Sequence, residues 1–170
     1  MGRLFSTFAT SAFRLETLAR YSVPEEADRL RLFMEGAPNP GPDEGQRAWQ
    51  SIVRRHAHAG RYMQRVHLIR GPLTDYLRFE IEWGYRDNAA AGEDIRILHV
   101  GPDELPELGS EDFWLFDDAL AIRMRYDDDG HWTGADTAES SLLAEYQRRR
   151  DQALALAVPL SDYLSEVRSP

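Results

Sequence analysis

Apolar residues recur along the chain with the periods of helices and strands in turn. Four side chains in the middle of the chain are spaced three and four residues apart: Trp49, Ile52, Val53 and His56. This spacing predicts an amphipathic helix that ends at Gly60. Residues 62–69 (YMQRVHLI) and 95–100 (IRILHV) are short apolar runs that predict strands.

A second helix is predicted between these two strands. Thr74 has the side chain of an N-cap, Gly92 is expected to close the helix, and its apolar stripe consists of Leu73, Leu77 and Ile81. A strand, a helix and a second strand in this order form a crossover unit, so the two strands are expected to be parallel.

The following segment predicts antiparallel strands. Residues 112–117 (DFWLFD) predict another strand, and residues 119–126 and 131–134 flank Asp127, Asp128, Asp129 and Gly130. An Asp-Gly pair between two strand-like runs is a hairpin signal.

The two ends of the chain complete the layout. Residues 11–17 predict a strand, and Ser22 with Glu25 has the spacing of a capping box for a helix that ends at Gly36. Residues 37–45 hold three prolines and two glycines, which predicts a loop. Residues 138–158 predict a last helix, which Pro159 breaks and which continues briefly to residue 167.

The predicted fold is α/β, or α+β in a strict classification, with a small mixed sheet flanked by helices. We expect a single domain over residues 1–170. It comprises an N-terminal strand and helix (11–36), the loop (37–45), a core (46–136) and a C-terminal helical segment (138–167).

Composition removes several chemistries. The chain has no cysteine, which excludes disulfides, thiolate zinc sites and cysteine nucleophiles. All 20 basic residues are arginine, so a Schiff-base lysine and a phosphate-binding P-loop lysine are also excluded. No apolar run is long enough to span a bilayer, the first ten residues do not resemble a signal peptide, and we expect a cytoplasmic protein.

Five blocks of the sequence resemble an uncharacterised family that is common in streptomycetes and related actinobacteria. They are SAFRLETLARY (11–21), RVHLIRGPLTDYLRFE (65–80), AGEDIRIL (91–98), DFWLFDD (112–118) and ALALAVPLSDYL (153–164). Members of that family are often encoded beside helix-turn-helix regulators of the WhiJ type, in loci discussed as toxin-antitoxin-like. The resemblance implies a regulatory context and a protein partner, and it supplies no catalytic residues.

The predicted order of strands also resembles one lobe of the phospholipase D-like fold. Active members of that superfamily carry a His-x-Lys motif. The strand expected to hold the motif has Phe113, Trp114, Leu115 and Phe116 instead, and the chain contains no lysine. The resemblance therefore implies a lobe that lacks its nucleophile and that can bind a phosphate group without cleaving it.

Two sets of residues are candidates for a phosphate or partner site. Arg65, His67 and Arg70 lie on or beside one predicted strand, and arginine forks suit phosphate recognition. Carboxylates that can bind magnesium or act as acid and base are Asp117 and Asp118 at a strand end, with Asp75 and Glu80 on the crossover helix. The alternative is that the histidine is buried and the aspartates only form turns.

Charge is unevenly distributed. Residues 46–74 hold six arginines and no acid, whereas residues 102–139 hold twelve acids and two arginines. The acidic segment, with Asp127, Asp128 and Asp129 at its hairpin, is a candidate surface for a basic partner. The alternative is that the two segments neutralise each other or face solvent. The net charge of −9 disfavours tight DNA binding by the chain itself.

Metal and cofactor sites are not predicted. His56 and His58 are two residues apart on a helix and point in different directions, whereas helical metal pairs prefer a spacing of four. The aromatic residues Phe113, Trp114 and Phe116 are expected in the core, and Tyr126 with Trp132 either joins it or forms an exposed patch.

We therefore expect a non-enzymatic regulatory protein that binds a protein partner, such as a helix-turn-helix regulator. The alternative is a phosphate-directed enzyme or nucleotide-binding module. A small-molecule sensor ranks third, and it requires a sizeable apolar pocket.

Overall fold

A computed structural model describes residues 2–101 and 107–167, and it is built on one seven-stranded sheet with the order β6-β5-β4-β1-β2-β3-β7. The strands are β1 (Ser11–Glu16), β2 (Tyr62–Arg70), β3 (Asp94–Val100), β4 (Asp112–Phe116), β5 (Leu120–Tyr126), β6 (Trp132–Thr137) and β7 (Val158–Pro159). Strands β1, β2 and β3 are parallel, and the other pairings are antiparallel. The mixed α/β class, the parallel pair β2–β3 and the β5–β6 hairpin are confirmed.

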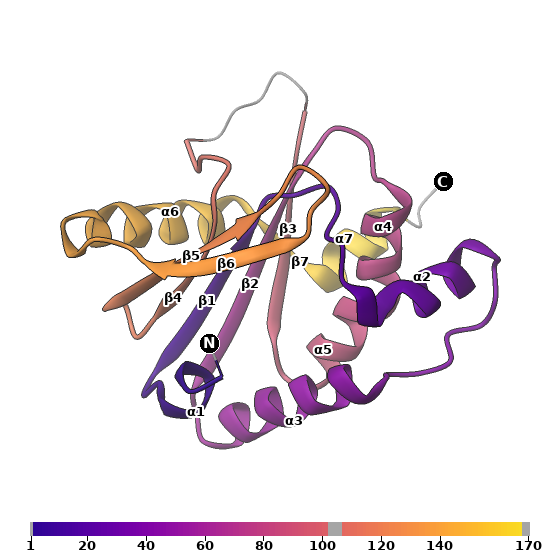
Figure 1. Cartoon of the computed structure of the whole chain (residues 1–170), viewed down its shortest axis with the longest axis horizontal. Helices are drawn as coiled ribbons and strands as arrows, with labels where there is room; N and C mark the ends of the chain where they lie inside the picture. Colours follow the sequence, from indigo (N-terminus) through magenta and orange to yellow (C-terminus); the bar gives the residue numbers. More distant parts are fainter. Residues whose placement is uncertain (1, 102–106, 168–170) are drawn as a thin grey trace.

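Helices cover both faces of this sheet (Figure 1). They are α1 (Leu4–Thr7), η1 (Pro24–Glu26), α2 (Ala27–Met34), α3 (Glu44–His58), α4 (Asp75–Phe79), η2 (Glu80–Tyr85), α5 (Arg86–Ala90), η3 (Ser140–Leu142), α6 (Leu143–Leu156) and α7 (Leu160–Val167). Helix α6 packs on one face, while α3 and the continuous α4–η2–α5 segment pack on the other. Within the described residues, no helix is long and apolar enough to cross a membrane.

The alternation of side chains along β1 divides the sheet into two chemically different faces. Phe13 and Leu15 point towards α6 and join an apolar core. Arg14 and Glu16 point to the opposite face, because successive strand residues alternate. The parallel register pairs Arg14 with Arg65 and Glu16 with His67 on β2. The face under α3 and η2 therefore carries a polar strip between its apolar clusters.

Three local predictions differ from the structure. The capping box at Ser22 is wrong, because the Ser22 hydroxyl donates to the Asp129 carbonyl and η1 begins without a side-chain cap. Asp43 and Gln46 form a capping box instead, so α3 begins at Glu44, inside the predicted loop. The short strand β7 was not predicted, and its Pro159 is tolerated because β7 is the edge strand.

The helix predicted after Thr74 is present but is not regular. The Thr74 hydroxyl accepts from the Leu77 amide, which confirms the N-cap. The segment then changes to a π-helix, η2, and returns to an α-helix at Arg86. Long π-helical stretches are rare, and π-bulges occur frequently at functional sites.

Candidate functional site

A cavity of about 640 Å³ opens on the polar face of the sheet, between η1, the N-terminal half of α3 and η2. We call it the aromatic cleft and define it by six of its lining residues: Glu26, Trp49, Arg65, Glu80, Trp114 and Trp132. They come from two strands of the sheet interior, one outer strand and three helical segments. The fold therefore assembles the cleft from positions that are distant in the sequence.

Aromatic rings form one wall of the cleft. Phe5 packs edge-on against Trp49 and Trp114, with ring centroids 5.1 and 4.8 Å apart. The Trp49 indole N–H donates to the Glu93 carboxylate at 3.0 Å, which fixes the orientation of this ring. Trp132 lies at the rim and is 57% exposed. The structure thus separates Trp132, which is exposed, from Tyr126, which joins the polar strip.

Carboxylates also line the cleft. Glu26 accepts a hydrogen bond from the Tyr76 hydroxyl at 3.2 Å, and Asp43 caps α3. The carboxylate of Glu80 makes no hydrogen bond or ion pair with any residue in the described ranges 2–101 and 107–167. Burial raises the pKa of Glu80 well above its ordinary range, and the nearby charge of Glu26 raises it further. Burial also raises the pKa of Glu26.

Arg65 forms part of the floor, but its guanidinium is already held by acids. Its Nη1 lies 2.9 Å from both carboxylate oxygens of Glu16, and its Nε donates to Glu93 at 2.9 Å. Its neighbour Arg14 donates to Asp112 at 2.8 Å and to the Tyr126 hydroxyl at 2.9 Å. Since each guanidinium faces at least one carboxylate, the floor offers little free positive charge to a ligand.

His67 is sealed beneath the same strip. Its Nε2 donates to the Leu18 carbonyl at 2.9 Å, and its Nδ1 lies 2.5 Å from the Tyr85 hydroxyl. That hydroxyl also donates to Glu16 at 2.8 Å. The side chain of His67 is fully buried, and this burial lowers the pKa of the histidine. His67 therefore orders the network around Glu16 and is not accessible to a ligand.

The remaining arginine and acids predicted from the sequence lie apart from this cleft. Arg70 ends β2 and donates to the Gly109 carbonyl at 3.0 Å. Asp75 is exposed in the first turn of α4. Asp117 accepts from the backbone amides of residues 9–11, and Asp118 pairs with Arg150 on α6. The structure brings Arg65 and His67 together, and it does not bring the other candidates to them.

The acids of the β5–β6 hairpin are divided between structure and solvent. Asp127 accepts from the amides of Asp129 and His131, which closes the turn. Asp128 and Asp129 are exposed. Asp103 and Glu104 of the acidic segment lie outside the described residues.

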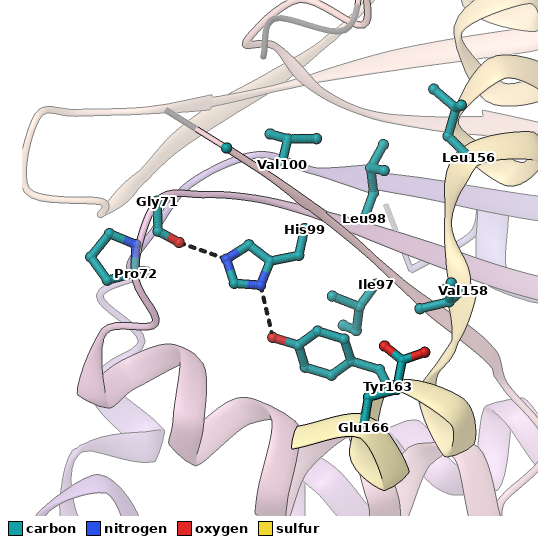
Figure 2. Close-up of a pocket in the computed structure, with 11 residues that line it drawn as sticks. Gly71, Pro72, Ile97, Leu98, His99, Val100, Leu156, Val158, Tyr163 and Glu166 are labelled. Atoms are coloured by element: carbon teal, nitrogen blue, oxygen red, sulfur yellow. Dashed lines mark hydrogen bonds between the residues drawn. The ribbon is translucent and has the colours of Figure 1, made fainter. Parts of the chain in front are cut away.

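A second cavity, of about 720 Å³, lies at the carboxyl end of β3 (Figure 2). His99 points into it, and its Nε2 donates to the Gly71 carbonyl at 2.7 Å. Its Nδ1 is 3.2 Å from the Tyr163 hydroxyl, so both ring nitrogens of His99 are used within the chain. Glu166 is the charged residue among the lining side chains that the structure describes. This cavity lacks the clustered tryptophans and carboxylates of the aromatic cleft.

Sequence reasoning missed most of the cleft. Trp49 and Trp114 were assigned to the core, and Glu26 and Asp43 were not considered. Glu80 was considered only together with Asp75, as a carboxylate on the crossover helix. One signal was present: Gly84 interrupts a helical pattern, and such a glycine often has a packing or functional reason. Within the described residues, no three histidine or acidic side chains are grouped so as to hold a metal ion.

Comparison with known proteins places the chain in a family. A search of curated proteins found no match. A family model described as "Domain of unknown function (DUF6879)" matches residues 1–165, which is nearly the whole chain. The chain therefore belongs to the DUF6879 family.

Proposed function

We propose that this chain is a non-enzymatic regulatory protein that binds a protein partner, and that a basic segment of the partner enters the aromatic cleft. The observation that carries this proposal is the composition of the cleft walls. Trp49, Trp114 and Trp132 line the cleft together with the carboxylates of Glu26, Asp43 and Glu80, and Arg65 is already shared by Glu16 and Glu93. Aromatic side chains and complementary charge are the usual means by which a protein surface recognises a partner.

A helix-turn-helix regulator fits this proposal as the partner. Such regulators are expected beside members of the family in actinobacteria, in loci of a regulatory or toxin-antitoxin-like kind, and this chain would act with one in the cytoplasm. DNA-binding proteins carry basic surfaces. A chain with a net charge of −9 and an acidic cleft is complementary to such a surface and unsuited to bind DNA directly.

The phosphate-directed alternative has weaker support. It needs Arg65 and His67 to be available together with Asp117 and Asp118. Arg65 is neutralised by two glutamates, and His67 is fully buried. The two aspartates hold the backbone before β1 and Arg150 instead. A degenerate phospholipase D-like lobe that binds phosphate would require these groups to rearrange.

The proposal is tested with the purified chain and the helix-turn-helix regulator encoded beside it. We expect a complex by isothermal titration calorimetry whose affinity falls as salt rises, because the contact is charge-assisted. Trp132→Ala should weaken the complex about tenfold, the size of a typical aromatic hot spot.

Leu156→Ala is the matched control, because Leu156 is also an exposed apolar residue but lies on α6 beside the other cavity. It should change the affinity less than about twofold. No complex at low salt, or equal affinities for the two variants, would contradict the proposal. Tight binding of DNA by the chain alone would contradict it as well.

A further inference from the structure

The geometry points to a specific occupant for the inner end of the aromatic cleft. We propose that this end binds the guanidinium group of one arginine side chain, held by the carboxylates of Glu80 and Glu26 and stacked against the tryptophan wall. The inference rests on the proposed function, and it names the chemical group that the cleft recognises in its partner.

The unpaired carboxylate of Glu80 is the first reason for this proposal. Its carboxylate lies in the cleft wall and has no hydrogen-bonding or ionic partner among the residues that the structure describes. Two buried acids nearby are paired: Glu16 with two arginines, and Glu93 with Arg65 and Trp49. A charged group withdrawn from water is costly unless it is paired. A cation supplied from outside would provide the missing partner.

The backbone around Glu80 is shaped to place this carboxylate. Glu80 begins the π-helix η2, and Gly84 lies four residues later on the same segment. A Cβ atom at position 84 would lie only 3.0 Å from Glu80 Oε1. The glycine therefore leaves room for the carboxylate to lie back against its own helix. Glycine inside a helix is less stable than alanine, so its presence here indicates a requirement for space.

The aromatic rings that line the cleft favour a flat cation. A guanidinium stacks on aromatic faces and donates in a fork that matches a carboxylate, whereas an ammonium is a compact and strongly hydrated charge. The chain already stacks its own guanidinium groups in this way. Arg29 lies 5.6 Å from the ring centroids of both Phe79 and Trp83, and Arg14 lies 5.7 Å from that of Trp114.

The amino-acid composition also favours arginine over lysine as the source of this cation. All 20 basic residues of this chain are arginine. GC-rich coding favours arginine codons over lysine codons and accounts for this composition, so a partner encoded in the same genome would present its positive charges mainly as arginine.

Binding of the cation should be linked to proton release. The charged groups that act on Glu80 come from every element packed around it: Glu26 on η1, Glu16 on β1, Arg65 on β2 and Arg29 on α2. Burial and the neighbouring acids raise the pKa of Glu80 well above its ordinary range. An arriving guanidinium favours the ionised carboxylate and so lowers this pKa. Affinity should therefore increase with pH across the titration of Glu80.

The test uses three tripeptides, acetyl-Gly-Xaa-Gly-amide, in which Xaa is arginine, citrulline or lysine. Citrulline has nearly the shape of arginine but carries no charge. We expect the arginine peptide to shift the indole N–H NMR signals of Trp49 and Trp114 saturably. The citrulline peptide should give no saturable shift, and the lysine peptide should bind at least threefold more weakly. Equal binding of citrulline, or tighter binding of lysine, would overturn the inference.

Two variants locate the site. Glu80→Gln should weaken the arginine peptide at least tenfold and remove its pH dependence. Glu82→Gln removes the same charge from the exposed side of η2 and should change binding less than twofold. Gly84→Ala should also weaken binding without lowering the melting temperature, because the new methyl group meets only the flexible end of Glu80.

Equal effects of the two Gln variants would overturn the inference. If the regulator complex were sensitive to Trp132→Ala but not to Glu80→Gln, the proposed function would stand and only the guanidinium assignment would fail.

Discussion

Replacing Glu16 by glutamine removes the centre of the buried ionic strip under the cleft. The side chain lies on β1 and the residue is 8% exposed. Both oxygens of its carboxylate lie 2.9 Å from Arg65 Nη1, and the carboxylate also accepts a hydrogen bond from the Tyr85 hydroxyl at 2.8 Å. Glutamine has nearly the same shape but no charge, so the variant isolates the electrostatic contribution.

The magnitude follows from the acidity of Glu16. Burial alone would raise its pKa, but Arg65 and Arg14 outweigh burial and lower the pKa to about 2, from a usual 4.5. At about 1.4 kcal/mol per pKa unit, the folded state favours the ionised carboxylate by about 3 kcal/mol. Because removing one partner of a buried ion pair typically costs ~3–5 kcal/mol, we expect Glu16→Gln to lose about 3 kcal/mol at pH 7.

The pH dependence provides a sharper check than the loss itself. The pKa is lower in the folded than in the unfolded chain, so the stabilisation is fully present above pH 4.5 and is lost as pH falls towards 2. Linkage predicts that wild type loses about 1.4 kcal/mol from this group between pH 7 and pH 3.5, whereas the variant has no such group. The difference in stability between the two proteins should therefore shrink by that amount.

Urea unfolding followed by tryptophan fluorescence measures both numbers. Glu145→Gln, which removes one partner of an exposed ion pair on α6, is the control and should cost less than about 0.5 kcal/mol. A Glu16→Gln loss below about 1 kcal/mol at pH 7, or a difference from wild type that is the same at pH 3.5, would refute the electrostatic account.

Three further substitutions test contacts that hold the fold together outside the cleft. Asp117→Ala should lower the free energy of unfolding in urea by about 1–2 kcal/mol, because it removes the acceptor of the backbone amides of residues 9–11. These amides lower the pKa of Asp117 against the opposing effect of burial, so the stabilisation by Asp117 should fade below about pH 4. Gly130→Ala should lower stability by more than about 2 kcal/mol, because φ is +82° and a Cβ would lie 2.6 Å from the Arg20 carbonyl oxygen; an unchanged melting temperature would contradict this. Asp118→Ala removes the half-exposed carboxylate that pairs with Arg150 and should change the melting temperature by less than about 3 °C.

The architecture was predictable because it depends on local periodicity. The alternation in residues 62–69 and 95–100 required two buried strands, and the helix between them allowed only a crossover, which the structure confirms as the parallel pair β2–β3. The Asp-Gly turn before His131 likewise fixed the β5–β6 hairpin. These signals each lie within a few residues and need no knowledge of the tertiary structure.

The cleft was not predictable because the periodicity of apolar residues does not distinguish a side chain that packs against another element from one that lines a cavity. Trp49 is spaced as a core residue, and it does pack on Phe5 and Trp114, yet it also lines the cleft. Glu26, Asp43 and Glu80 belong to three separate elements that only the tertiary fold brings together. The capping box at Asp43 was overlooked because the prolines before it indicated a loop.

Several charged side chains of the two segments form ion pairs with residues that lie outside both segments. Arg65 of the basic segment pairs with Glu16 and Glu93, and Asp112 of the acidic segment pairs with Arg14. These pairs are not a mutual neutralisation of the two segments, whereas other charged residues of both segments are exposed, as the solvent-facing alternative expects: Arg47, Arg54, Arg55, Asp128 and Asp129. Charge counted along a sequence ignores the third segment, here β1, which lies between β2 and β4 in the sheet.

The position of β1 also decides which ligand charge the cleft can accept. Arg14 and Arg65 are directly opposed in the parallel register, so they would repel each other and attract anions if they were free. Glu16 lies beside both of them and holds each guanidinium within 3.4 Å. Among residues 2–101 and 107–167, no arginine lies within hydrogen-bonding distance of the carboxylates of Glu26 and Glu80. A cleft whose floor consists of neutralised arginines and whose wall consists of unneutralised acids selects a cation, even though its most visible residue is an arginine.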